Sequence, residues 1–160
     1  MRLLITGGAG FIGSTLVRQA LAEGHEVVVL DALTYAGRRE HLPDGVAFRR
    51  GRVEDYQSFL NVMGFVRRDG RSFDAVLHLA AESHVDRSIE DGNAFVTTNV
   101  LGTQVLLQAL HQVGWRGRFV HVSTDEVYGA LAPDEPAWKE DAPFKPTGPY
   151  AASQAAAEHF

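Results

Sequence analysis

Cysteine is absent from the 160 residues of the chain, and lysine occurs only at Lys139 and Lys145. Without thiols the chain forms no disulfide, no thiolate metal site and no cysteine nucleophile. A net charge of −5 argues against nucleic-acid binding. No apolar run approaches the length of a membrane span, and the first run breaks at Gly7, too short for a signal peptide. We therefore expect a cytoplasmic protein with no nucleic-acid or membrane partner.

Short apolar segments alternate with segments of helical spacing along the chain. Strands are predicted at Arg2–Thr6, Glu26–Asp31, Val46–Arg50, Ala75–Leu79 and Arg118–Ser123. Helices are predicted at Ser14–Glu23, Gln57–Arg68, Asn93–Val113 and from Pro149 onward. This alternation is typical of an α/β fold with a doubly wound parallel sheet.

The C-terminal part of the sequence is of a different kind. Most of the prolines lie between Ala130 and Pro149, which indicates a surface loop. The helix that follows has no stop signal before Phe160. We expect residues 1–160 to form one domain of a longer protein, with no complete substrate domain.

A glycine turn joins the first strand to the first helix, at Gly7, Gly10 and Gly13. In a dinucleotide site such glycines allow a tight turn, close approach of the pyrophosphate and close helix packing. The second strand ends in Asp31, where a carboxylate accepts hydrogen bonds from the adenosine ribose and repels a 2′-phosphate. The pattern predicts a Rossmann-type domain that prefers NAD to NADP. The alternative is a glycine turn without a ligand.

Thr124, Asp125 and Glu126 follow the fifth predicted strand. Ligands of open α/β sheets bind at the carboxyl ends of strands, and two adjacent carboxyls can serve as acid and base. Ser123 and Glu126 also fit a capping box. Function and capping therefore both remain open for this segment.

Tyr150 lies one helical turn before Gln154 on the last predicted helix, so the two share a face. A tyrosine with a cation at this spacing can act as a base, because the charge favours the phenolate. Gln154 is neutral, and Arg87 is a candidate for a compensating cation. On spacing alone, an ordinary buried tyrosine is the alternative.

His78 and His84 suggest a metal site, but no third ligand is convincingly placed. We therefore predict no metal and interpret His78 as a core histidine. Asn99 could be a polar side chain turned to solvent. Arg38 and Arg39 could contact a phosphate or be solvated.

Four segments together resemble the dTDP-glucose 4,6-dehydratases, which are extended short-chain dehydrogenases/reductases. These segments are Gly7–Gly13, Asp31–Gly37, His78–Ile89 and Val122–Gly129. The resemblance spans nearly the whole chain and covers about the first half of a family member. It implies NAD as cofactor, dTDP-glucose as substrate and a homodimer formed through the helices near Asn93–Val113 and from Pro149.

The resemblance also implies roles for individual residues. Tyr150 takes the proton of the sugar 4-hydroxyl, which Thr124 binds. Glu126 then removes the C5 proton while Asp125 protonates the leaving 6-hydroxyl. Ser83 and Thr124 are the predicted substrate-binding residues. The predicted cofactor-binding residues are Gly7, Gly10, Phe11, Ile12, Gly13, Asp31, Thr34, Arg52, Val53, Leu79, Ala80, Ala81, Ser83, Asn99, Tyr150 and Gln154.

The sequence departs from the family pattern at two positions. Gln154 stands where the family has a lysine that binds the nicotinamide ribose and favours the phenolate. Arg52 stands where an aspartate accepts from the adenine amino group; arginine cannot accept, though it could stack on the ring. Because of these departures, a second interpretation stays open, in which the chain is a catalytically impaired NAD-binding fragment or paralogue of this family. A third interpretation, after the dehydratase and the impaired relative, is a sugar-nucleotide 4-epimerase. It ranks last because epimerisation needs no acid pair.

Overall fold

The computed structural model describes residues 1–69 and 72–160, with no account of side chains at 64–69. It contains one parallel sheet with strand order β3-β2-β1-β4-β5. The strands are β1 (Arg2–Thr6), β2 (Glu26–Asp31), β3 (Ala47–Arg50), β4 (Ala75–His78) and β5 (Arg118–His121). The reversal of strand order beside β1 confirms the predicted doubly wound, Rossmann-type sheet.

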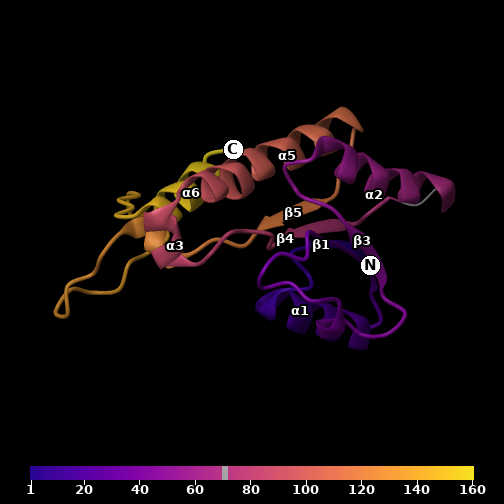
Figure 1. Ribbon diagram of the computed structural model, residues 1–160, viewed down its shortest axis with the longest axis horizontal. Helices are drawn as coiled ribbons and strands as arrows, with labels where there is room; N and C mark the ends of the chain where they lie inside the picture. The colour runs from indigo at the N-terminus through magenta and orange to yellow at the C-terminus, as the bar shows by residue number, and fades with distance from the viewer. Residues whose placement is uncertain (70–71) are drawn as a thin grey trace.

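Helices cover both faces of this sheet (Figure 1). α1 (Phe11–Ala22) packs on one face, where Leu3 and Ile5 point. α2 (Tyr56–Asp69) and α5 (Gly102–Gln112) pack on the other, which receives Leu4. Because side chains alternate along a strand, an apolar run such as β1 supplies both cores at once. Within the described residues, no helix is both long and apolar enough to cross a membrane.

The long helix predicted over Asn93–Val113 is interrupted. It consists of α4 (Asn93–Phe95), a π-helical stretch η2 (Val96–Leu101) and then α5. The hydroxyl of Thr103, in the first turn of α5, donates to the carbonyl oxygen of Asn99 in this stretch at 2.6 Å. A π-helical stretch widens the helix by one residue per turn, and this is often found at functional sites.

Other predicted boundaries need correction. Strands β4 and β5 end at His78 and His121, because the paired rows of β1, β4 and β5 end there together. α1 begins at Phe11 rather than Ser14, directly after the glycine turn. The sequence analysis missed the short helix α3 (Val85–Glu90), which has only two apolar residues.

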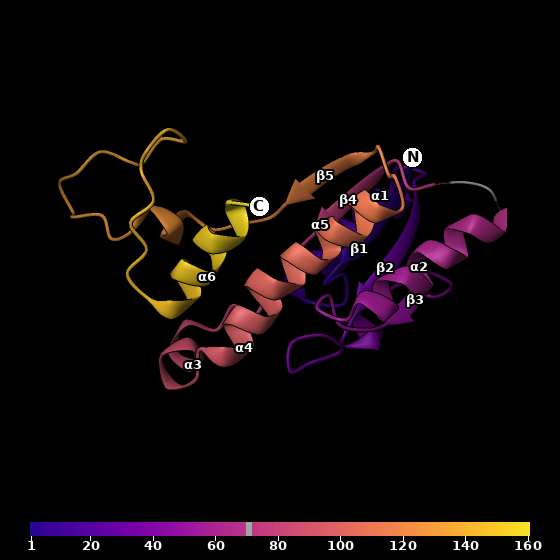
Figure 2. The same ribbon diagram turned by 90° about the horizontal axis from the view of Figure 1, so that it is seen from above.

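The remaining elements lie beyond the carboxyl ends of the strands (Figure 2). η3 (Asp125–Tyr128) and α6 (Pro149–Glu158) flank the proline-rich loop, which extends away from the sheet. α6 begins at Pro149, as predicted from the tolerance of the first helical turn for proline. The short η1 (Arg39–His41) follows β2. The fold thus gathers α3, η3 and α6 at the edge where ligands of such sheets bind.

Candidate functional site

A cleft of about 320 Å³ opens at the carboxyl ends of the strands. It is bounded by the turn after β1, the loop after β2, the segment after β4 and α6. All but one of the predicted cofactor residues line this cleft. They are Gly7, Gly10, Phe11, Ile12, Gly13, Asp31, Thr34, Arg52, Val53, Leu79, Ala80, Ala81, Ser83, Tyr150 and Gln154. The exception is Asn99.

The glycine turn is built so that side chains cannot enter it. Gly7 has φ +69°, and a Cβ there would lie 2.6 Å from the Ala80 nitrogen. A Cβ on Gly13 would lie 2.2 Å from the Gly7 carbonyl oxygen. Within α1, which is described throughout, the N-cap offers no side-chain hydrogen bond and the first turn has no acidic residue. The turn therefore presents free N–H groups to an anion such as a pyrophosphate.

Asp31 is buried at the end of β2, and its carboxylate holds two loops in place. One oxygen accepts the Ala9 N–H at 2.9 Å, and the other accepts the Leu33 N–H at 2.8 Å. Leu33 has φ +53°, a conformation that non-glycine residues seldom adopt. Each carboxylate oxygen keeps a further lone pair, and Asp31 lines the cleft. The carboxylate therefore shapes the cleft and still faces it.

Asn99 lies behind the cleft wall, and its side chain is 1% exposed. Its amide oxygen accepts the Glu82 N–H at 2.8 Å, while its NH2 donates to the Glu82 carbonyl and the Ser153 hydroxyl, both at 2.9 Å. The alternative of a solvent-facing Asn99 is thus wrong. The structure places Asn99 as a brace between the segment after β4 and α6.

His78 is a core histidine, as interpreted from the sequence. Its Nδ1 lies 2.6 Å from the Thr6 hydroxyl, and its Nε2 lies 3.0 Å from the Thr103 hydroxyl. The Thr103 proton is committed to the Asn99 carbonyl, so Thr103 accepts from Nε2–H. With its N–H on Nε2, neutral His78 has an acceptor nitrogen at Nδ1, so the Thr6 hydroxyl donates to Nδ1 while it accepts the Ala80 N–H. This chain of hydrogen bonds fixes the Nε2–H tautomer of neutral His78.

His84 is exposed at the N-terminus of α3. Among the residues that the structure describes, no three His, Asp or Glu side chains are grouped to hold a metal ion. Both nitrogens of His78 are already used within the core, so His78 has no lone pair for a metal.

Neutral His78 gives a testable pH dependence of stability. Burial, with a smaller contribution from His121, lowers the pKa of His78 from 6.5 to about 3. The unfolded chain therefore binds one more proton between those values, and stability falls as the pH is lowered from 6.5 toward 3. Just below pH 6, we expect this residue to reduce the free energy of unfolding by about 1.4 kcal/mol for each pH unit. Urea unfolding between pH 6.5 and 5 measures it.

The matched control for this prediction is the exposed His84. Replacement of His84 by Gln should leave the slope unchanged, whereas His78→Gln, which keeps one donor and one acceptor, should reduce it. Equal slopes in the unmutated chain and His78→Gln would contradict the assignment.

The segment after β5 forms the 3-10 helix η3, and its N-cap is Thr124. The Thr124 hydroxyl accepts the Glu126 N–H at 3.3 Å. The capping box between Ser123 and Glu126 is therefore not formed, and the Ser123 hydroxyl donates to the Glu158 carboxylate instead. Asp125 and Glu126 are exposed, next to Ser123 in the cleft wall. The cleft wall ends at Ser123 in this segment, and the three predicted catalytic residues that follow it, Thr124, Asp125 and Glu126, do not themselves line the cleft. Because Thr124 caps η3, the two carboxyls have no capping role.

Tyr150 and Gln154 both line the cleft and are 9% and 3% exposed. The Tyr150 ring packs edge-on against Phe95 at 6.3 Å. The Ser88 hydroxyl accepts the Tyr150 N–H at 3.2 Å, and Ser153 donates to the Tyr150 carbonyl at 2.7 Å. The sequence analysis missed both serines, because nothing in the spacing indicates that Ser88 of α3 contacts α6 or that Ser153, within α6, contacts Asn99.

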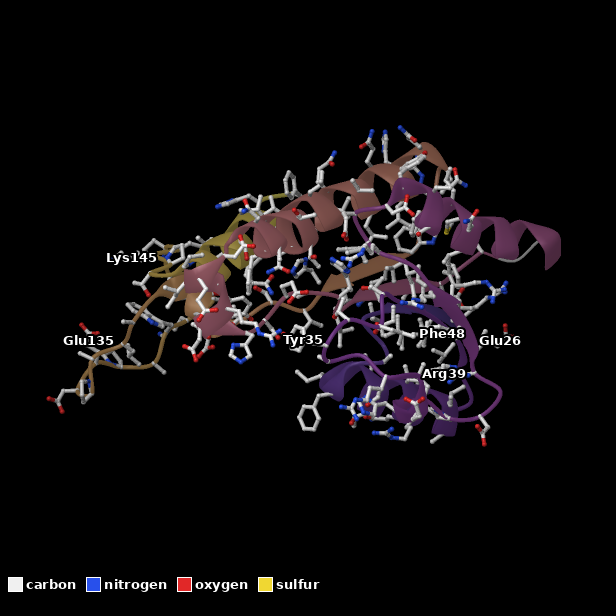
Figure 3. The ribbon with its side chains drawn as sticks, viewed as in Figure 1. Glu26, Tyr35, Arg39, Phe48, Glu135 and Lys145 are labelled. Atoms are coloured by element: carbon white, nitrogen blue, oxygen red, sulfur yellow. The ribbon has the colours of Figure 1, made fainter. Side chains whose placement is uncertain are left out.

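Three arginines singled out in the sequence make different contacts. Arg87, the candidate for a compensating cation, stacks over the Tyr35 ring at 4.4 Å. Figure 3 shows Tyr35 between the loop after β2 and α3. Arg52 lines the cleft and pairs with Glu54 at 3.3 Å. Arg39 lies 5.4 Å from the Phe48 ring. The contact between Arg87 and Tyr35 joins α3 to the loop after β2.

Comparison with known proteins gives one family and close relatives. Residues 4–160 match the family model described as GDP-mannose 4,6 dehydratase. The chain is 49% identical over 163 residues to the dTDP-glucose 4,6-dehydratase of Streptomyces griseus, covering 98% of this chain and 47% of the relative. It is 46% identical over 171 residues to that of Streptomyces niveus, covering 99% and 47%. The chain thus spans about half the length of the curated relatives it matches.

Two solved structures are similar in fold and sequence. One is the UDP-glucose 4-epimerase of Thermus thermophilus in complex with NAD, with a TM-score of 0.90 and 42% identity over 99% of this chain and 49% of that one. The other is DesIV, a dTDP-glucose 4,6-dehydratase of Streptomyces venezuelae with NAD bound. It has a TM-score of 0.85 and 49% identity over 99% of this chain and 50% of that one.

Proposed function

Because this chain belongs to the GDP-mannose 4,6-dehydratase family, we propose that residues 1–160 form the NAD-binding domain of a nucleotide-sugar 4,6-dehydratase and carry its catalytic residues. The proposed reaction is the NAD-dependent conversion of dTDP-glucose to dTDP-4-keto-6-deoxyglucose. The names of the curated relatives support dTDP-glucose as the substrate.

One observation carries this proposal. A single cleft is lined by the glycine turn after β1, Asp31 at the end of β2 and Tyr150 of α6. The glycine turn leaves room for a pyrophosphate, which a Cβ at Gly7 or Gly13 would take. The residues present therefore fit a dinucleotide that extends from Asp31 toward Tyr150.

NAD, when bound, supplies a reversible acceptor for the sugar hydride. In the proposed mechanism Tyr150 takes the proton of the 4-hydroxyl, while Thr124 hydrogen-bonds that hydroxyl. Oxidation at C4 acidifies the C5–H bond, so the Glu126 carboxylate can remove this proton. Asp125, protonated, gives its proton to the 6-hydroxyl, which leaves as water. The product then needs the hydride taken from C4 to be delivered to C6, which the reduced cofactor would supply, while Glu126 returns its proton to C5, so no further oxidant or reductant is consumed. Elimination needs one proton taken and one given, and the two adjacent carboxyls can supply both roles.

Cofactor preference tests the first part of the proposal. Asp31→Asn removes the charge beside the ribose but keeps an acceptor for one of the two loop amides. We expect the ratio of NADP to NAD affinity to rise by about tenfold or more, since a 2′-phosphate no longer meets a carboxylate. Asp31→Ala should shift the ratio in the same direction. Titration calorimetry with both cofactors measures the ratio on the chain itself.

Asp44→Asn serves as the control, because Asp44 is exposed in the loop before β3. It should leave the ratio unchanged. Equal or tighter binding of NADP by the unmutated chain would sink the proposal for Asp31.

Two other functions remain as alternatives. The similarity to a UDP-glucose 4-epimerase favours epimerisation, which uses a tyrosine base and no acid pair. Gln154 and Arg52 favour an impaired NAD-binding relative. The presence of two adjacent carboxyls, Asp125 and Glu126, directly after the cleft residue Ser123 supports dehydration over these alternatives.

We further propose a homodimer in the cytoplasm. The predicted interface helix exposes two large apolar side chains, Val96 at 58% and Leu101 at 47%. Both belong to η2, whose turn also positions Asn99. A second copy of the chain that covered these side chains would remove their apolar surface from water.

A further inference from the structure

The order of the strands determines where the base of a bound dinucleotide lies. The glycine turn follows β1, Asp31 ends β2, and β3 is the next strand in the sheet. In the proposed binding mode the pyrophosphate lies at the turn and the adenosine ribose at Asp31. Because the ribose joins the pyrophosphate to the base, the base continues past Asp31 toward the residues that follow β3. These residues, Gly51 to Glu54, line the same cleft.

The backbone of the segment after β3 is held in place on two sides. The Gly51 N–H donates to the Asp31 carbonyl oxygen at 3.1 Å, which fixes the segment beside the end of β2. Val53 is buried in the core, and a Cβ on Gly102 of α5 would lie 2.7 Å from its Cγ2 atom. The side chain of Glu54, the next residue, therefore starts from a fixed position.

Glu54 keeps one carboxylate oxygen for a ligand. Its side chain is 14% exposed, and its Oε1 accepts from the Arg52 guanidinium at 3.3 Å. Among the side chains that the structure describes, none contributes a hydrogen bond to Oε2, and no side-chain oxygen is both fully buried and unpaired. Oε2 is therefore accessible, and Glu54 lines the cleft. Arg52, whose side chain is 61% exposed, occupies the other oxygen.

We propose that Glu54 determines the specificity of the cleft for adenine, by accepting a hydrogen bond from the exocyclic amino group of the base. An ionised carboxylate is an acceptor only, so it favours a base with an amino donor over one with a carbonyl oxygen at that position. Arg52, which has no acceptor, cannot make this contact. The sequence analysis did not single out Glu54. This inference rests on the proposed NAD binding.

The hypoxanthine analogue of NAD tests the inference, because it carries a carbonyl oxygen in place of the adenine amino group. Titration calorimetry with each dinucleotide gives two Kd values for the same chain. We expect the analogue to bind the unmutated chain about tenfold or more weakly than NAD, the effect of replacing a hydrogen bond to a charged group by two facing acceptors.

A pair of matched variants locates the preference. Glu54→Gln should bring the two Kd values within about threefold of each other, because an amide can accept from the amino group or donate to the carbonyl oxygen. Glu82→Gln removes the same charge from another residue of the cleft wall and should leave the ratio of the two Kd values unchanged. Thermal unfolding of both variants checks that the fold is intact.

The outcomes separate this inference from the proposed function. A chain that fails to bind NAD would overturn the cofactor proposal and this inference with it. Equal affinity of the unmutated chain for NAD and the hypoxanthine analogue would overturn this inference alone, and that comparison needs no variant. A ratio that falls in Glu82→Gln as much as in Glu54→Gln would also overturn it, because the overall charge of the cleft would then set the preference.

Discussion

Replacing Glu126 by glutamine should slow formation of the 4-keto-6-deoxy product by about 100-fold or more, the usual effect of losing a general base. Glutamine has nearly the same shape but cannot accept the C5 proton. The reaction is best followed in a chimaera that joins residues 1–160 to the remaining half of the Streptomyces griseus relative. Incorporation of solvent deuterium at C5, measured by mass spectrometry, should fall together with product formation.

Asp125→Asn separates the two carboxyl roles. It removes the proton donor for the 6-hydroxyl, so exchange at C5 should persist while product formation falls. Glu140→Gln is the matched control, since Glu140 is exposed in the proline-rich loop and should leave both rates unchanged. C5 exchange in Glu126→Gln at the unmutated rate would show that Glu126 is not the base.

The strands and the cofactor cleft could be predicted from the sequence because their signals are local. β1 and β2 are apolar runs buried on both faces, and both were predicted with the observed bounds. The glycine turn could be predicted because its three glycines lie within a few residues of one another. Gly7 and Gly13 approach Ala80 and each other so closely that no other residue fits.

The braces of the site could not be predicted, because each one joins segments far apart in the sequence. Asn99 contacts Glu82 and Ser153, and His78 links Thr6 to Thr103. The π-helical stretch that positions Asn99 has the same apolar spacing as an ordinary helix. The contacts around it come from distant segments as well, since Thr103, which donates to the Asn99 carbonyl, is bound by His78 of the sheet.

A second large change in rate is expected from a substitution at Gln154. Gln154→Lys should raise the rate of the chimaera near neutral pH by about tenfold or more, because an ammonium within about 4–6 Å shifts the ionisation of a phenol by about one to three pH units toward lower pH. Gln154 and Tyr150 lie one helical turn apart, and both line the cleft. The added charge therefore lies on the face of α6 that carries the proposed base.

Burial determines whether a lysine introduced at position 154 stays protonated. The site of Gln154 is 3% exposed, so a lysine there loses hydration and needs a partner. The phenolate of Tyr150 is such a partner on the cleft side, and Glu158 is another near His121.

The test is the pH–rate profile of the chimaera with Gln154, Gln154→Lys and the neutral control Gln154→Met. The lysine variant should show its basic limb at lower pH, and the methionine variant should not. Carbon-13 labelling of tyrosine in the 160-residue chain follows the phenol itself, and the signal of Tyr150 should titrate at lower pH in Gln154→Lys. If the profiles of Gln154 and Gln154→Lys superimpose, Tyr150 is activated by another group or is not the base. If the profile shifts while the phenol signal does not, the lysine acts on the reaction through another group, and the electrostatic argument for Tyr150 fails.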